Sequence, residues 1–436
     1  MSDSLIIIGG GLAGSEASWQ AASRGVRVTL YEMRPHKLTE AHQTGLLGEL
    51  VCSNSLRSND PQSAPGLLKQ ELKMADSLIM AAAEASSVPA GSALAVDRAV
   101  FAGFITQRLD MHPNIEVIRE EMTDIPDRLA ILATGPLTSE AMTTKLSAIV
   151  GSDYLYFYDA IAPIIDAGSI DYEKVYRMSR YGKGGDDYIN CPMTKEDYEK
   201  FYAALTEADR VTPRNFEENQ VFEGCMPIEV MAVRGVDTPR FGPMKPVGLP
   251  DPRTGRDPYA VVQLRAENRE LTAYNLVGFQ TRLKWPEQKK VFSLIPGLEK
   301  AEFLRYGSLH RNTFINAPLA LNRDLSLKAR NNLFVAGQVT GVEGYIESTA
   351  MGLIAGINAA ARMTGRHAED VPPASAHGAL IRHLIEAEGK NFQPSNINFG
   401  LFPIPENALK IRDKKARRAL IAEKALKDWQ QYLKGL

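Results

Sequence analysis

A glycine-rich turn near the start of the chain has the spacing of a phosphate-binding site. Residues 4–8 read Ser-Leu-Ile-Ile-Ile, which predicts a buried parallel strand, and Gly9, Gly11 and Gly14 follow it as a G-x-G-x-x-G pattern. In such a turn the first glycine permits a tight bend, the second lets backbone N–H groups approach a pyrophosphate, and the third allows close helix–strand packing. The residues expected around the phosphates are Gly9, Gly10, Gly11, Leu12, Ala13 and Gly14.

The elements after this turn complete a dinucleotide-binding unit. Residues 15–24 favour a helix with Gly25 as its stop, and residues 26–31 predict a second strand that ends at Glu32. The positive end of the helix would face the phosphates, and the carboxylate of Glu32 would accept the ribose hydroxyls. A lone G-x-G-x-x-G is a weak signal, but a strand, a helix and an acid in sequence favour dinucleotide binding over a merely structural turn.

Two later segments distinguish FAD from NAD. Residues 129–136 predict a buried strand that ends in Ala-Thr-Gly, and residues 333–345 predict another that leads into a glycine-rich turn. A helix is expected over 346–363, where Gly352 and Gly356 allow close approach to another backbone or to a ligand. An NAD domain does not need a return strand so late in the chain. In a flavoprotein the first end holds the ADP half and the late corner holds the flavin ring, so FAD is favoured over an ordinary αβ packing unit.

Two cysteines lie in polar turns where a thiol can act as a nucleophile. Cys52 stands in Val-Cys-Ser-Asn-Ser with Arg57 nearby in sequence, and Cys225 stands in Gly-Cys-Met-Pro after a predicted strand. A thiolate becomes a strong nucleophile close to positive charge or to a helix N-terminus. For both residues a buried structural role is an equal alternative. Cys191, in Asn-Cys-Pro, is expected to be structural.

The composition is that of a globular protein of two or three domains. The chain has 436 residues, and its 50 Lys and Arg against 52 Asp and Glu give a net charge of -2, which excludes a histone-like basic protein. No apolar run approaches the ~20 residues that span a bilayer. No signal peptide and no metal-binding cysteine pattern is apparent. Three scattered cysteines fit a reducing compartment, so we expect a cytoplasmic protein without membrane contact.

The middle of the chain has a different sequence pattern from its two ends. Short aromatic and β-branched runs predict an antiparallel sheet, and these runs are 154–158, 188–191, 220–223, 259–264 and 274–279. A helix is expected over 194–208, with Thr194 as its N-cap. The predicted fold class is α/β, with an FAD-binding Rossmann-type (glutathione-reductase-like) domain and an inserted α+β domain. We expect residues 1–150 and 308–366 to form the FAD-binding domain, 151–307 the inserted substrate domain, and 367–436 a C-terminal helical segment.

Motifs spread over essentially the whole chain carry a family resemblance. They are GGGLAGSEA at 9–17, YEMRP at 31–35, ELVCSNSLRS at 49–58, VPAGSALAVDR at 88–98, FEGCMPIEVMA at 222–232, FGPMKPVGL at 241–249, HRNTFINAP at 310–318 and AGQVTGVEGYIES at 336–348. Together they resemble the folate- and FAD-dependent tRNA uracil-5-methyltransferase family. The nucleotide-binding ends are shared with a relative of that family, the flavoprotein that modifies the tRNA wobble uridine.

The resemblance implies an enzyme that methylates tRNA. Members of this family bind FAD, are reduced by NADPH or NADH, and take a one-carbon unit from 5,10-methylenetetrahydrofolate to make 5-methyluridine in the T loop. The chemistry is consistent, because a thiolate that adds at uracil C6 makes C5 nucleophilic. A flavin N5 can carry the methylene to C5, and hydride from the reduced flavin then completes the methyl group. The target uracil must leave its stack, which implies flipping into a pocket.

The resemblance also implies roles for individual residues. Cys225 is the expected nucleophile and Cys52 the second catalytic thiol, either a base or a protector of the flavin adduct, and the reverse order stays open. His310 is the candidate to stack on the folate, and Glu343 the candidate to bind near the pterin nitrogens. Beyond the first turn, the expected cofactor-binding residues are Glu32, Arg34, Gly135, Gly337, Gln338, Gly341, Glu343, Gly344 and Tyr345.

A basic C-terminal segment is a candidate for RNA contact. Residues 410–436 carry nine Lys and Arg against three acids in a helical pattern. This fits phosphate contact as well as it fits a solvated amphipathic helix. Two other functions stay open: a wobble-uridine tRNA modification flavoprotein, against which the segments around Cys52 and Cys225 argue, and an NADPH-linked flavin oxidoreductase that does not bind RNA.

Overall fold

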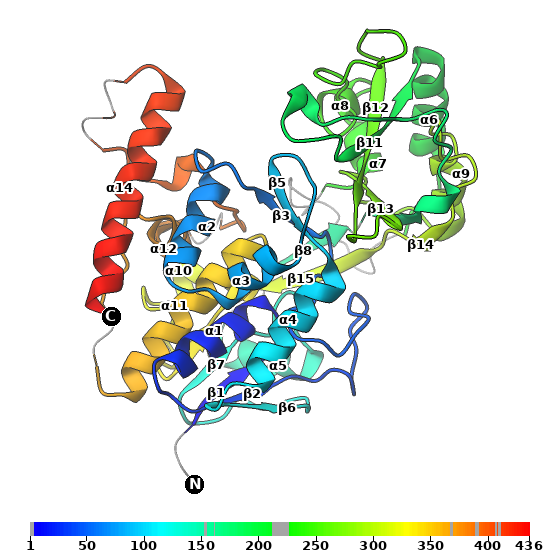
Figure 1. Ribbon diagram of the computed structural model, residues 1–436. Coiled ribbons are helices and arrows are strands. Elements are labelled where there is room, and N and C mark those ends of the chain that lie inside the picture. The colour runs from blue at the N-terminus through cyan, green and yellow to red at the C-terminus, as the bar shows by residue number, and fades with distance from the viewer. Residues whose placement is uncertain are drawn as a thin grey trace.

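A computed structural model shows two bodies, a larger one built from both ends of the chain and a smaller one built from its middle (Figure 1). The structure describes residues 4–151, 155–160, 162–211, 226–366, 369–388, 392–405, 408 and 411–436, and it describes only the backbone of 155–160 and 309–311. No helix in the described part of the chain has both the length and the apolar character needed to cross a membrane.

A five-stranded parallel sheet forms the centre of the larger body. Its order is β16 (Leu333–Val335), β7 (Ala130–Leu132), β1 (Leu5–Ile8), β2 (Val28–Tyr31) and β6 (Ile115–Ile118). All residues of β1, β7 and β16 are buried, as expected for strands covered on both faces. Strands predicted near residues 4, 129 and 333 therefore lie side by side, and the predicted α/β Rossmann-type fold class is confirmed.

Two helices from opposite ends of the chain pack closely on this sheet. They are α1 (Leu12–Ser23) and α11 (Tyr345–Met363). A Cβ atom at Gly352 would lie 2.2 Å from the carbonyl oxygen of Ala13, and one at Gly356 would lie 2.6 Å from that of Ala17. The two glycines thus allow backbone-to-backbone contact, which is the first of the two roles predicted for them.

The other elements of the larger body surround this centre. A small antiparallel sheet has the order β3 (Ser55–Ser58), β5 (Ala93–Val96) and β4 (Ser87–Val88). The helices are α2 (Ala64–Met74), α3 (Leu78–Ala85), α4 (Arg98–Asp110), α5 (Glu140–Val150), α10 (Ala317–Ala320), α12 (Ala376–Glu386) and α14 (Lys414–Gly435). The basic helix α14 is anchored by Trp429, whose indole is fully buried, stacks on His377 and donates to the carbonyl of Glu71.

The smaller body is built on a six-stranded sheet. Its order is β10 (Tyr176–Arg177), β11 (Tyr188–Met193), β12 (Ala260–Ala266), β13 (Ala273–Leu276), β9 (Ile164–Asp166) and β14 (Phe303–Arg305), and every pairing is antiparallel. The helices are α6 (Lys195–Glu207), α7 (Ile228–Val233), α8 (Thr238–Phe241) and α9 (Trp285–Phe292). Thr194 caps α6 through a reciprocal bond with Asp197, so the predicted N-cap is confirmed.

One predicted strand pairs elsewhere. The run 154–158 was expected in the inserted sheet, but β8 (Leu155–Ala160) instead pairs with β15 (Leu309–Phe314) in a separate two-stranded ribbon. The two strands are far apart in the chain, and local pattern does not identify a distant pairing partner. This ribbon joins the smaller body to the larger one (Figure 1). The run 220–223 lies outside the described residues.

Candidate functional site

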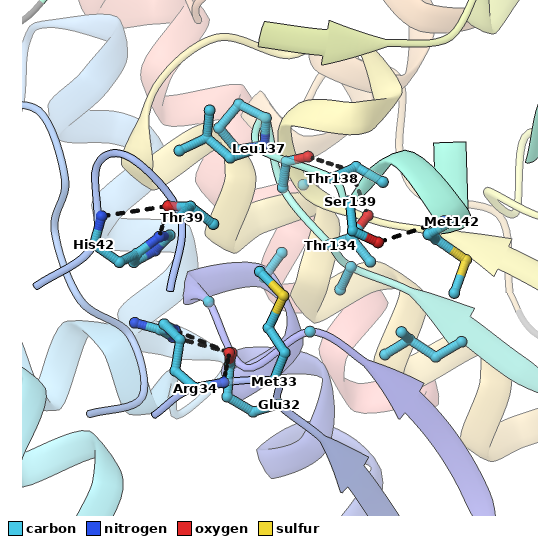
Figure 2. A pocket seen from close by; sticks show the side chains of 18 of the residues that line it. Glu32, Met33, Arg34, Thr39, His42, Thr134, Leu137, Thr138, Ser139 and Met142 are labelled. Atoms are coloured by element: carbon cyan, nitrogen blue, oxygen red, sulfur yellow. Dashed lines mark hydrogen bonds and ion pairs between the residues drawn. The ribbon is translucent and has the colours of Figure 1, made fainter. Parts of the chain in front are cut away.

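A pocket of about 1000 Å³, part of it open to solvent, lies at the carboxyl ends of β1 and β7. In parallel α/β sheets this edge is where ligands bind. Figure 2 shows Glu32 and Arg34 on one side of the pocket and Thr134 and Thr138 on another. The predicted site residues that line it are Gly9, Gly11, Leu12, Ala13, Glu32, Arg34, Gly135, Gly337, Gln338 and Tyr345.

The glycine turn has the geometry of a phosphate cradle. Gly9 has a φ of 102°, and a Cβ there would lie 2.5 Å from the carbonyl oxygen of Ala133. A Cβ at Gly14 would lie 1.8 Å from the carbonyl oxygen of Gly9, whereas a Cβ at Gly11 would meet nothing within 4 Å. Helix α1 begins after Gly11 without a side-chain cap, which leaves its first N–H groups available to an anion in the pocket. These residues fit the pyrophosphate of a dinucleotide.

Glu32 is held more tightly than the sequence suggests. Its Oε2 accepts from the Gly10 N–H at 2.9 Å and from Arg34 Nη2 at 3.0 Å, and its Oε1 accepts from the N–H and Nε of Arg34. Burial alone would raise the pKa of Glu32, but hydrogen bonds and charge from Arg34 outweigh it, and the pKa is lowered. A carboxylate has about four acceptor positions. A ribose hydroxyl at Glu32 therefore has to share or displace one of these donors.

Arg34 acts on its surroundings as well as on Glu32. Its Nη1 lies 3.0 Å from Glu49 Oε2, and its side chain is almost fully buried. The carboxylate of Glu49 also accepts from the N–H groups of Gln43 and Thr44, so one ion pair fixes the loop over 43–49. Arg34 thus has a visible structural role beside its predicted role toward the cofactor.

Several lining residues were not predicted. They come from the loop before β3, from the segment after β6 and from the turn after β7, and include Thr39, His42, Glu121, Thr134, Thr138 and Ser139. Burial and the neighbouring Arg34 lower the pKa of His42 to about 4, so its imidazole is neutral at pH 7. For Thr134, Thr138 and Ser139 the only signal in the sequence was their position directly after a predicted buried strand. The loop around His42 gave no signal at all.

In the late corner Gln338 lies on the pocket wall, whereas the predicted Gly341, Glu343 and Gly344 are not among the lining residues. Gln338 Nε2 donates to Glu343 Oε2 at 2.6 Å, and the Glu343 side chain is buried. Gly341 and Gly344 lie in the turn before α11, and both have a positive φ. Helix α11 begins at Gly344 without a side-chain cap, so a second uncapped helix N-terminus adjoins the pocket at Tyr345 and Ser348. This arrangement can stabilise negative charge on a bound ring.

Cys52 contacts this wall through a residue from the other end of the chain. The phenol oxygen of Tyr345 accepts from the N–H of Cys52 at 2.7 Å and from the N–H of Ser53 at 3.1 Å. Tyr345 and Val51 both line the pocket. Burial and the neighbouring Cys52 raise the pKa of the Tyr345 phenol, so it stays protonated. The half-buried Cys52 is therefore bonded through its backbone to a residue of the pocket wall, and its catalytic role stays a prediction.

Three arginines surround Cys52, and none of them is the one that the sequence suggested. Arg98, Arg265 and Arg305 lie within electrostatic range of the thiol. Arg98 donates to the carbonyl of Cys52 at 3.0 Å, whereas Arg57 instead pairs with Glu347 at 3.0 Å. Reactive cysteines typically lie in electropositive, partly exposed environments of this kind.

The Cys52 loop is also bonded to both bodies. Asn54 Nδ2 donates to the carbonyl of Val96 in the larger body at 3.0 Å and to that of Ala266 in the smaller body at 2.9 Å. Arg265 of β12 donates to Asn54 Oδ1 at 3.1 Å and to the hydroxyl of Ser53 at 2.9 Å. These contacts join three segments that are distant in sequence, around residues 54, 96 and 265, so no local pattern could predict them.

The other two cysteines and His310 remain to be placed. Cys191 is fully buried in β11, and burial raises the pKa of its thiol, which agrees with a structural role. Cys225 lies outside the described residues, and only the backbone of His310 is described, in β15. The roles proposed for these two residues stay predictions.

Comparisons with known proteins identify relatives over the full length of the chain. The model of the family described as glucose inhibited division protein A matches residues 4–367. A protein of Geobacter sulfurreducens named methylenetetrahydrofolate–tRNA-(uracil-5-)-methyltransferase TrmFO is 57% identical over 435 residues, which cover 99% of each chain. The protein of the same name from Moorella thermoacetica is 58% identical over 430 residues, 98% of each chain.

A solved structure shows the same fold at low identity. GidA of Aquifex aeolicus, in its form II crystal, matches with a TM-score of 0.70 at 16% identity, over 99% of this chain and 75% of that one. This likeness supports the FAD-binding fold class. Because the full-length relatives share more than half of their residues with this chain, it belongs to the TrmFO family of methylenetetrahydrofolate–tRNA-(uracil-5-)-methyltransferases.

Proposed function

We propose that this protein methylates C5 of a uridine in the T loop of tRNA, with 5,10-methylenetetrahydrofolate as carbon donor. The observation that carries the proposal is the placement of Cys52, which is bonded through its backbone to Tyr345 on the wall of a dinucleotide-type pocket. The names of the full-length relatives support this substrate class. The glycine turn and the starts of α1 and α11 would hold FAD in this pocket, and the flavin, once reduced by NADPH or NADH, would supply the hydride and the carrier for the one-carbon unit.

Different residues of the chain bind the cofactor and carry out the reaction. The uncapped start of α1 after Gly11 holds the phosphates, and Glu32 orients the ribose. The uncapped start of α11 stabilises negative charge on the ring. One thiolate adds to C6 of the uracil to make C5 nucleophilic, and a second group removes the C5 proton. We assign the addition to Cys225 and the second role to Cys52.

Three guanidinium groups lie near Cys52. Of the three guanidinium groups near it, only Arg98 pairs with a carboxylate among the described residues, at 2.6 Å from Glu267. Arg265 and Arg305 bring further positive charge, and burial lowers the pKa of both. An excess of positive charge at a half-buried site favours a bound anion such as a phosphate of the substrate.

The test is a reconstituted methylation reaction. Purified protein that carries FAD is incubated with unmodified tRNA transcript, NADPH and carbon-labelled methylenetetrahydrofolate, and label on the T-loop uridine is expected. Absence of label on this uridine would reject the proposal, and label on a wobble uridine would favour the related modification flavoprotein.

The cysteine roles have a test of their own. Cys225→Ala and Cys52→Ala are each expected to abolish methylation, with Cys191→Ala as the matched control because its thiol is buried away from the pocket. Trapping on fluorouracil-containing RNA identifies the nucleophile, since only that cysteine forms the covalent adduct. If neither variant loses activity, the assignment is wrong.

A further inference from the structure

A stack of three nearly parallel aromatic rings ends on an exposed tryptophan of the smaller body. Tyr306 lies on Phe303 with ring centroids 5.0 Å apart and 9° between the planes. Trp285 lies on Tyr306 at 5.4 Å and 13°. Phe303 also contacts the fully buried Phe292. The stack therefore runs from the core to solvent, where the Trp285 side chain is 62% exposed.

A basic recess adjoins the stack. It holds about 1260 Å³, open to solvent, and Phe303 and Tyr306 form part of its wall. Lys289, Lys290 and Lys300 also line it. Among the described residues Lys289 and Lys300 have no ion-pair partner, and Lys290 has only a 3.7 Å contact with Glu287. Ammonium groups without a carboxylate partner are available to an anionic ligand.

The acids of the recess do not cancel this charge. Glu299 and Glu302 also line it, but Glu299 already pairs with Lys174 at 2.8 Å and accepts from the N–H of Gly297 at 3.0 Å. Among the described lining residues this leaves one carboxylate, that of Glu302, against three lysines. The recess therefore keeps an excess of positive charge beside a flat, exposed ring. A base stacks on an aromatic face while its phosphates bind ammonium groups, and single-stranded RNA sites combine these two elements.

We propose that Trp285 and the lysines of this recess bind an unpaired nucleotide of the RNA substrate next to the target uracil. The inference rests on the proposed function, and it names the surface that holds the RNA. Arg305 directly precedes Tyr306 and lies within electrostatic range of Cys52 and Tyr345, so β14 leads from the stack to the catalytic pocket.

The position of α14 supports this choice of surface. In Figure 1 the basic helix α14 lies at the far edge of the larger body, whereas α9 and β14 lie together on the smaller body. The lysine-lined recess adjoins the strand that reaches toward Cys52, and α14 does not. We therefore infer that one base flips out of an RNA loop toward Cys52 while its neighbour stacks on Trp285. The segment from Trp285 to Arg305 would connect the two positions.

The stacking surface is tested by two substitutions with a matched control. Trp285→Ala is expected to weaken binding of a T-arm RNA hairpin about tenfold or more, since base–aromatic stacking is lost. Trp285→Phe keeps a ring and is expected to bind within a few-fold of wild type. Phe241→Ala removes an exposed aromatic ring of the smaller body that lies outside the recess, and it is expected to leave binding unchanged. Melting temperature and flavin content confirm that each variant is folded.

Tryptophan fluorescence gives a second measurement that does not depend on the alanine variant. Trp429 is fully buried and Trp19 is half-buried, whereas Trp285 is exposed, so RNA is expected to quench mainly Trp285. Trp285→Phe is therefore expected to lose the quenching while it retains RNA binding. Quenching that persists in Trp285→Phe would contradict the proposal.

The lysines are tested by salt dependence. Lys289→Ala with Lys300→Ala is expected to reduce the slope of log affinity against log salt by about 0.7 for each lost phosphate contact. The control is Lys195→Ala on α6, whose lysine contacts Glu199 at 3.7 Å. NADPH oxidation without RNA is expected to stay at the wild-type rate in all variants.

The outcomes separate this inference from the proposed function. If wild-type protein methylates tRNA and Trp285→Ala binds and methylates it equally well, the proposed function stands and the assignment of this surface is wrong. If wild-type protein neither binds nor methylates RNA, the proposed function itself is wrong. The assignment would also be wrong if Trp285→Ala no longer bound another protein but still bound RNA as tightly as wild type does.

Discussion

The phenol of Tyr345 is expected to position the Cys52 loop, and Tyr345→Phe removes only its hydroxyl. That oxygen accepts two backbone hydrogen bonds, from Cys52 at 2.7 Å and Ser53 at 3.1 Å. At about 1 kcal/mol for each bond, the variant loses about 2 kcal/mol of stabilisation, mostly within the loop. A displacement of about 1 Å at a reacting group lowers rates by up to about 100-fold. We therefore expect methylation to fall 10- to 100-fold while the ring of residue 345 still lines the pocket.

The assay compares this variant with Tyr202→Phe. The Tyr202 hydroxyl likewise bonds to the backbone, but it donates to the carbonyl of Ala232 at 3.0 Å and lies in the smaller body. Both variants are expected to lose stability in urea unfolding. Only Tyr345→Phe is expected to change the alkylation rate of Cys52, measured by peptide mass spectrometry, and to lose methylation at unchanged flavin content. Equal Cys52 reactivity and equal activity in both variants would refute the positioning role.

Three further predictions concern packing, pH and the third cysteine. Gly352→Ala is expected to cost about 1–3 kcal/mol and to lower flavin content, because its Cβ would lie 2.2 Å from the carbonyl oxygen of Ala13; unchanged melting and an unchanged absorbance spectrum would contradict this. Burial raises the pKa of Glu16 from 4.5 to about 7, so its stabilising contribution is complete below about pH 4.5 and is lost as pH rises through 7. Glu16→Gln is therefore expected to gain stability over wild type in urea unfolding at about pH 9 but not at about pH 5, by up to about 3 kcal/mol. Cys191→Ala is expected to cost about 1–2 kcal/mol through lost packing and to leave methylation unchanged, and a loss of methylation without unfolding would contradict its structural role.

The framework of the pocket could be predicted because its signals are local. The strand before Gly9, the turn itself and the strand that ends near Gly135 each occupy a few consecutive residues. Their geometry follows from steric rules that apply wherever the pattern occurs. The spacing of Gly352 and Gly356 predicted close approach to another backbone or to a ligand, and the structure shows that α1 supplies the backbone.

The electrostatic surroundings of the thiol could not be predicted. Arg98, Arg265 and Arg305 lie far apart in sequence, and they meet at Cys52 only because the smaller body folds back onto the larger one. Because Arg57 is close to Cys52 in sequence, it was the arginine expected near the thiol, but it forms an ion pair with the buried Glu347 instead. The pairing of β8 with β15 was missed for the same reason, because a local strand pattern does not show which distant strand it pairs with.

The bonds of Asn54 have a mechanical consequence. Its amide contacts carbonyls of both bodies, and Arg265 reaches from the smaller body to the same side chain. The two bodies therefore cannot rotate apart as rigid units unless these bonds break or the loop that carries Cys52 moves with one of them. A change in the angle between the two bodies would therefore alter the surroundings of the Cys52 loop, because Asn54 lies two residues from Cys52.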